Sequence, residues 1–130
     1  MNIDYLSLYE DFKDAGDRSF CTALAYCLVT GANMHIANAR LRRKRGRGVS
    51  GLILNEAIQD AGYHMLEVKV KGYVENLPKK GLTRGTYLVY SSRHVSVIKD
   101  GEVLDWTALK EARSKRTVVC YQLLKTGDSL

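Results

Sequence analysis

The chain has 130 residues, of which 45% are hydrophobic and 26% charged, and a formal net charge of +6. This length fits one domain with a single core, and no apolar run approaches the roughly 18 residues of a transmembrane helix. The first 14 residues include acids and lack the apolar stretch of a signal peptide. The chain has three cysteines, a small and odd number that argues against a disulfide framework. This indicates a reducing compartment, so we expect a cytoplasmic protein.

Four helices are predicted in the first half of the chain, over residues 3–13, 19–31, 34–43 and 50–62. Ser19 is expected to cap the second helix at its start, and Gly31 to end it. This helix is apolar on nearly all sides, so it should be the central, buried one. Asn33 would cap the third helix, Ser50 would cap the fourth, and Gly62 would end the fourth.

The second half changes from helical to alternating apolar patterns. Strands are predicted over residues 64–72, 86–92, 94–99, 102–106 and 116–124. Residues 73–85 read as irregular with a short turn of helix, and 107–115 as a short helix or loop. Helices followed by an antiparallel meander indicate a single α+β domain, with a helical half over about 1–62 and a sheet half over about 63–125.

The pair Asp100 and Gly101 is a strong hairpin signal that favours a two-residue type I′ turn. In that register Ser96 faces Asp105, and His94 becomes the diagonal neighbour of Asp105 on the same face of the sheet. Diagonal neighbours lie about 7–8 Å apart, within reach of an imidazole and a carboxylate. The pair is interpreted either as part of a site or as an ordinary pair on a solvent face.

Cys21 falls in the first turn of the predicted central helix. Free backbone N–H groups and the helix dipole stabilise a thiolate there, and the N–H of Cys21 itself would face a developing oxyanion. A histidine could then act as general base, with a carboxylate orienting its ring. Cys27 lies in the middle of the helix and Cys120 inside a strand, so both are interpreted as core residues.

A zinc site would be the competing use of Cys21, Cys27, His35 and His64. Their spacings contain no tight ligand pair, and one knuckle is missing. The two histidines have no strand-borne acid nearby and are interpreted as structural. The sequence therefore predicts no metal and no cofactor.

Residues 40–47 hold six basic side chains and no acid: Arg40, Arg42, Arg43, Lys44, Arg45 and Arg47. The remaining basic and acidic residues balance, so the charge excess of the chain is local. Such a cluster can contact phosphate or an acidic protein. The alternative interpretation is a solvated helix end and loop.

Two stretches, "CTALAYCLVTG" and "GTYLVYSSRHVSVIKDGEVLD", carry a resemblance that covers nearly the whole chain. The order of a cysteine opening a helix, a histidine opening a strand and an aspartate one strand later resembles the papain-like cysteine peptidase superfamily. Within that superfamily, the chain more closely resembles small phage and bacterial proteins with a "C-T/V-x-A-L-A…T-G" helix and a "G-T-Y-L-V…H-V…V…D-G-x-V-x-D" hairpin.

The resemblance implies a helical lobe, with a central helix starting at the nucleophile, packed on a small antiparallel sheet. It implies Cys21 as the nucleophile, His94 as the base and Asp105 as the orienting acid, in a cleft between the two halves. Papain relatives usually place a glutamine about six residues before the nucleophile, where this chain has Ala15. Either Asp17 or Ser19 would therefore have to help stabilise the oxyanion, or the Cys21 N–H would act together with a water molecule.

Two functions follow as expectations. The first is a cysteine-dependent peptidase or isopeptidase that acts on a host or phage protein, in the host cytoplasm if the chain is phage-encoded, with acyl transfer by the same triad as a variant. The second is a catalytically silent papain-fold binding module that uses residues 40–47 to engage nucleic acid or an acidic protein. No membrane contact is expected, and the oligomeric state is left open.

Overall fold

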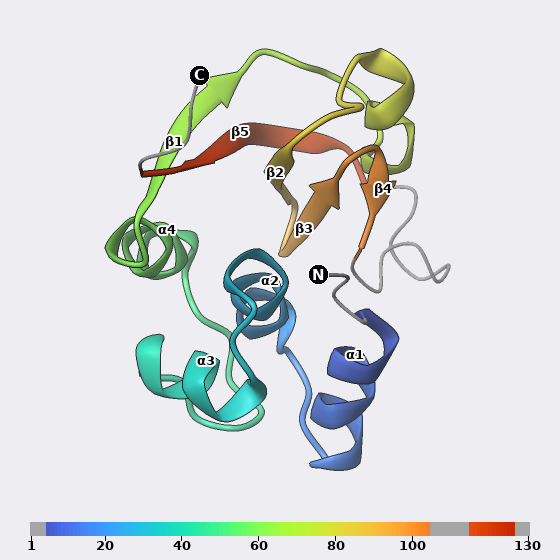
Figure 1. Cartoon of the computed structure of the whole chain (residues 1–130). Coiled ribbons are helices and arrows are strands. Elements are labelled where there is room, and N and C mark those ends of the chain that lie inside the picture. The colour runs from blue at the N-terminus through green and yellow to red at the C-terminus, as the bar shows by residue number, and fades with distance from the viewer. Residues whose placement is uncertain (1–4, 105–114, 127–130) are drawn as a thin grey trace.

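The computed structural model describes residues 5–104 and 115–126 (Figure 1). Four helices come first: α1 (Tyr5–Asp14), α2 (Cys21–Thr30), α3 (Met34–Arg40) and α4 (Gly51–Asp60). The strands follow as β1 (Tyr63–Val68), β2 (Thr86–Ser91), β3 (His94–Lys99), β4 (Glu102–Val103) and β5 (Thr117–Lys125), and the 3-10 helix η1 (Val74–Lys80) lies between β1 and β2. The fold class is α+β, as predicted. No helix in the described part of the chain is long and apolar enough to cross a membrane.

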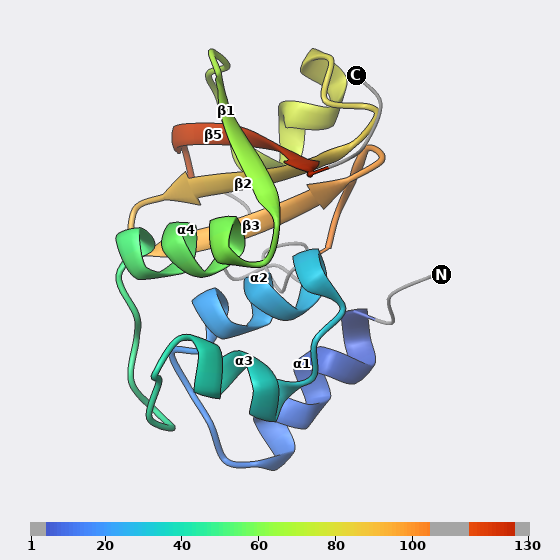
Figure 2. The same cartoon turned by 60° about the vertical axis from the view of Figure 1, so that its left-hand side comes forward.

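The strands form one antiparallel sheet in the order β1-β5-β2-β3-β4. Figure 2 shows α2 between this sheet and the layer formed by α1 and α3. Side chains from one face of the sheet pack with the helices, and those from the other face pack with η1 in a second, smaller cluster. Because both faces are covered, β3 is buried along most of its length.

Helix α2 is the central helix, as its all-round apolar sequence predicts. Every residue from position 22 to position 29 is buried, and Leu24 and Leu28 have no exposed surface. Gly31 ends the helix in the left-handed conformation, with φ of 80°. The predicted cap at Ser19 is wrong: Phe20 is the N-cap residue and makes no side-chain capping hydrogen bond. Ser19 instead adopts a left-handed φ of 56°, which turns the chain just before the helix.

The predicted caps of the next two helices are confirmed. The Ile36 N–H donates to Asn33 Oδ1 over 2.9 Å, and the Ile53 N–H donates to Ser50 Oγ over 3.4 Å. Helix α3, however, stops at Arg40 rather than at position 43. Arg42 has a left-handed φ of 52°, which breaks the helix and directs the following residue into the interior.

The β3–β4 hairpin has the predicted turn. Asp100 and Gly101 have φ of 49° and 84°, as a type I′ turn requires. Lys99 pairs with Glu102 and Ile98 with Val103, and the Leu104 N–H donates to the Val97 carbonyl over 2.8 Å, which continues the same register. Asp105 and nearly all of the segment predicted as a short helix or loop fall at 105–114, outside the described residues.

Candidate active site

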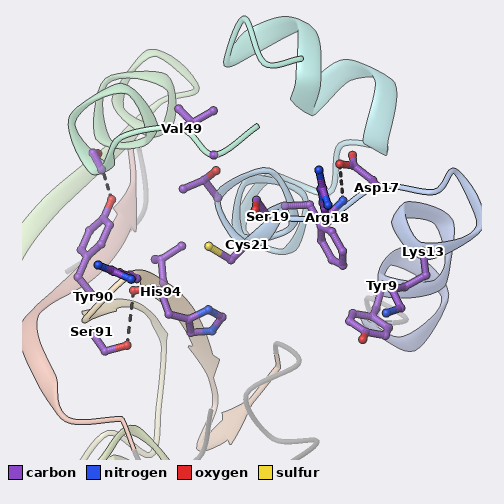
Figure 3. A pocket seen from close by; sticks show the side chains of 16 residues that line it. Tyr9, Lys13, Asp17, Arg18, Ser19, Cys21, Val49, Tyr90, Ser91 and His94 are labelled. Carbon is purple, nitrogen blue, oxygen red and sulfur yellow. Dashed lines mark hydrogen bonds between the residues drawn. The ribbon is translucent and has the colours of Figure 1, made fainter. Parts of the chain in front are cut away.

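A pocket of about 690 Å³ opens where the start of α2 meets the β2–β3 turn (Figure 3). Its wall also includes the last turns of α1 and the loop that leads into α4. The size falls within the range of sites for small ligands. The residues that border it include Tyr9, Lys13, Arg18, Cys21, Tyr90 and His94.

Cys21 is the first residue of α2 and is half-buried at the pocket. Figure 3 shows its sulfur directed away from the helix, toward the side of the pocket from which Tyr90 and His94 come. The first helical hydrogen bond runs from the Leu24 N–H to the Phe20 carbonyl, so the N–H groups of the first turn precede the helical ladder. With no side-chain cap at Phe20, this end of the helix presents its positive dipole to the pocket.

The loop before Cys21 is fixed by a buried ion pair. The carboxylate of Asp17 accepts two hydrogen bonds of 2.8 Å from the Arg43 guanidinium and one of 2.7 Å each from the Gly46 and Arg18 N–H groups. Burial acts to raise the pKa of Asp17, but the hydrogen bonds from Arg43 and the two N–H groups outweigh it, so that pKa is lowered. A carboxylate held ionised in this way has no proton to donate, so its side chain does not supply the oxyanion donor considered for Asp17. Ser19 lies on the pocket wall and stays a prediction.

Arg43 does not belong to a free basic patch. All five of its N–H donors are used, because it also donates to Asn38 Oδ1 and to the carbonyls of Arg18 and Arg47. Its side chain has no exposed surface. Arg45 is exposed and donates to the Ala15 carbonyl over 3.0 Å. The other four members of the cluster are exposed: Arg40, Arg42, Lys44 and Arg47.

His94 is the first residue of β3 and is only 4% exposed, so the interpretation of a pair on a solvent face is wrong for its histidine. Strand alternation places His94 on the η1 face of the sheet, whereas Val95 packs on the helix face. Because His94 lies at the end of the strand, it still borders the pocket that Cys21 enters from the helix face. Both residues therefore meet the pocket at the end of the sheet.

The β2–β3 turn that precedes His94 is held from several sides. Arg93 adopts a left-handed φ of 57° within the two-residue turn. Ser91 Oγ donates to the His94 carbonyl over 3.5 Å, and Lys115 Nζ donates to the Ser92 carbonyl over 2.8 Å. These contacts fix the backbone position of His94.

Tyr90 is a pocket residue that the sequence patterns did not single out. Its hydroxyl donates to Asn55 Oδ1 over 2.6 Å and lies 3.1 Å from the Gly51 carbonyl. Burial raises the pKa of Tyr90, and neighbouring Tyr121 and Cys21 add to the effect, so the phenol stays protonated. A Cβ at Gly51 would lie 2.9 Å from the Tyr90 ring, so glycine lets α4 approach this wall. The sequence feature that could have indicated this close approach is Gly51, a glycine directly after the helix cap at Ser50.

The other cysteines and histidines lie away from this pocket. Cys27 and Cys120 are buried, and burial raises their pKa values to about 12 and about 11. His35 and His64 are exposed on α3 and β1. Within residues 5–104 and 115–126, no three His, Cys, Asp or Glu side chains form a group that could hold a metal ion.

Comparison of the chain with protein-family models, with curated proteins and with solved structures found no match in any of the three.

Proposed function

We propose that the protein is a papain-like cysteine hydrolase that cleaves an amide bond of a peptide or isopeptide. Cys21 is the nucleophile, His94 the general base and acid, and Asp105 the carboxylate that orients the imidazole. The observation that carries this proposal is the pocket that both the start of α2 and the start of β3 border, with Cys21 and His94 on its wall. A helix start and a cysteine–histidine pair are what an activated thiol requires.

In the proposed reaction, the imidazole of His94 takes the proton of the Cys21 thiol. The thiolate attacks the acyl carbon, a C–S bond forms, and the carbonyl electrons move onto oxygen, near the N–H groups of the first turn of α2. The intermediate collapses as the C–N bond breaks and the leaving amine takes the proton from His94. A water molecule, deprotonated by the neutral imidazole, then attacks the thioester, and Cys21 leaves as the thiolate.

The role of Asp105 is inferred from the register of the hairpin. The pairs Lys99–Glu102 and Ile98–Val103 and the hydrogen bond from Leu104 to Val97 all follow the predicted alignment. One more step in the same register would set Asp105 opposite Ser96, diagonal to His94. That position suits a carboxylate that fixes the imidazole tautomer.

The binding-module alternative has less support. Its basic cluster is divided, because Arg43 is buried with Asp17 and Arg45 is engaged with the loop that precedes Cys21. At least part of the basic run therefore serves to position the candidate nucleophile. Four exposed cations remain: Arg40, Arg42, Lys44 and Arg47.

The test is the pH dependence of Cys21 alkylation by iodoacetamide, with the modified residue located by mass spectrometry. We expect Cys21 to be labelled faster than a free thiol at neutral pH, because the His94 imidazolium and the helix dipole stabilise the thiolate. His94→Asn should raise the pH at which labelling begins, and Cys21→Ser should abolish labelling of this site. A Cys21 curve that matches that of a free thiol, and that His94→Asn leaves unchanged, would contradict the proposal.

A further inference from the structure

We propose that this site takes acidic peptide substrates, in which carboxylate side chains flank the scissile carbonyl. The inference rests on the proposed function and concerns the charge of the pocket. Three of the residues on its wall are exposed cations, Lys13, Arg18 and Arg93. They come from three separate segments, so the positive charge lies around the pocket and not along one element.

The described residues of the pocket wall carry more positive than negative charge. Among the described residues that line the pocket, Asp17 is the one carboxylate. Its charge is neutralised by Arg43, and its oxygens are turned to that guanidinium and to backbone N–H groups. Within residues 5–104 and 115–126, no carboxylate forms an ion pair with Lys13, Arg18 or Arg93. A bound anion would therefore meet cations that have no described acidic partner.

Each of the three exposed cations occupies a defined place in the fold. Lys13 lies in the last turn of α1, with Nζ 5.7 Å from the centroid of the Tyr9 ring. Arg18 is held through its N–H by Asp17 and through its carbonyl by Arg43. Figure 3 shows Lys13 and Arg18 on the α1 side of the pocket, across from Tyr90. Arg93 occupies the turn directly before His94.

The proposed chemistry indicates that the anion bound by these cations is a peptide. The reaction at Cys21 needs an acyl carbon, which the backbone of a nucleic acid does not offer. The negative charges that accompany an acyl carbon in a peptide are the carboxylates of Asp, Glu and the C-terminus. Cations around a cleft raise the local concentration of such a ligand and favour its carboxylates over neutral amides of the same shape.

The first experiment compares two alkylating reagents of nearly equal size, anionic iodoacetate and neutral iodoacetamide. The measured quantity is the ratio of their second-order rate constants at Cys21, divided by the same ratio for the neutral thiol 2-mercaptoethanol. Because each ratio is taken on one thiol, the fraction of thiolate cancels. We expect about a fivefold to tenfold preference for iodoacetate at about 10 mM ionic strength, falling to less than about twofold at about 1 M, where the Debye length is about 3 Å.

Variants test whether the preference for iodoacetate comes from the pocket cations, from the net charge of the protein or from His94. Replacing Lys13, Arg18 and Arg93 with Gln should lower the ratio at least about threefold at low salt, because three nearby charges are removed. The matched control replaces three exposed cations near η1 with Gln: Lys71, Lys79 and Arg84. This control loses the same net charge and should keep most of the preference. An unchanged ratio in the pocket variant, or an equal loss in the control, would overturn the inference.

A second experiment uses acyl donors. The α-thiobenzyl esters of N-acetylglutamate and N-acetylglutamine each transfer their acyl group to the Cys21 sulfur and release benzyl thiolate, and the acylated protein is quantified by mass. We expect faster acylation by the glutamate ester in the native protein and equal rates in the pocket variant. Equal rates in the native protein would overturn the acidic-peptide inference alone. Absence of any activated labelling of Cys21 by iodoacetamide would instead show that the proposed function itself fails.

Discussion

The two cysteines of α2 lie in opposite surroundings, one at the start of the helix and one in its middle. Cys21 is half-buried on the wall of a pocket, with the free end of the helix behind it. Cys27, on the same helix, has no exposed surface, and burial raises its pKa to about 12. Since the chemical group is identical, we expect these local surroundings to decide which thiol can react.

The two positions also depend on different parts of the molecule. The middle of α2 is buried because the helix is apolar on all sides and is enclosed by the sheet and by the other helices. Its start is held by a loop with a left-handed residue at Ser19 and by the Asp17–Arg43 ion pair. The following predictions test this contrast, beginning with the largest expected effect.

The largest effect is expected in the labelling of the three cysteines. In the folded protein, iodoacetamide should modify Cys21 at least about a thousand times faster than Cys27 or Cys120, because the buried thiols become accessible only through unfolding. Mass mapping over a time course measures the three rates. In denaturant all three should react alike. Comparable rates in the folded protein would remove the distinction between the two ends of the helix.

The ion pair that fixes the start of α2 is the next target. Arg43→Ala should cost about 3–5 kcal/mol in the free energy of unfolding, because it leaves the Asp17 carboxylate buried without a partner. Urea unfolding measures this loss, and Arg45→Ala, which removes an exposed arginine with one hydrogen bond to the chain, should cost less than about 1 kcal/mol.

The destabilisation by Arg43→Ala should also depend on pH. The pKa of Asp17 in the folded protein is below its ordinary value of 3.8, so the ion pair contributes stability above that pH and loses it as the pH falls through the folded pKa. The difference between the native protein and the variant should therefore shrink in acid. A difference that does not change with pH would show that Asp17 is not the group involved.

Truncation along α2 should separate function from packing. Leu24→Ala should cost about 2–5 kcal/mol, because it leaves a cavity in the core, whereas Cys21→Ala should cost less than about 1 kcal/mol while removing all labelling at the site. Thermal or urea unfolding of the two variants gives the comparison. If Cys21→Ala unfolds the protein, Cys21 is a packing residue and not a nucleophile.

The smallest effect is expected from the orienting carboxylate. Asp105→Ala should slow Cys21 alkylation at neutral pH about tenfold and raise the pH at which it begins, because His94 loses the partner of its charged form. Asp100→Asn is the matched control: Asn tolerates the left-handed φ of 49° and keeps an oxygen to accept from the Gly85 N–H. If both variants leave the curve unchanged, Asp105 takes no part in the site.

The sequence by itself determined the features that depend on neighbours along the chain. The caps at Asn33 and Ser50 need an oxygen three residues from an N–H, and the hairpin register needs only the Asp100–Gly101 turn. The burial of α2 follows from its composition on every side. Each of these features depends on residues within one or two turns of backbone, so local patterns were sufficient to predict it.

The tertiary structure decided what lies around Cys21. The Asp17–Arg43 pair joins residues 26 positions apart, and nothing local distinguishes Arg43 from the other basic residues beside it. Packing between α4 and β2 likewise brings Tyr90 to the pocket wall. Side chains distant in sequence meet only when helices and sheet pack together. The order of Cys21 and His94 along the chain could therefore be taken from the sequence, whereas the charged pocket that both residues border could not be predicted from it.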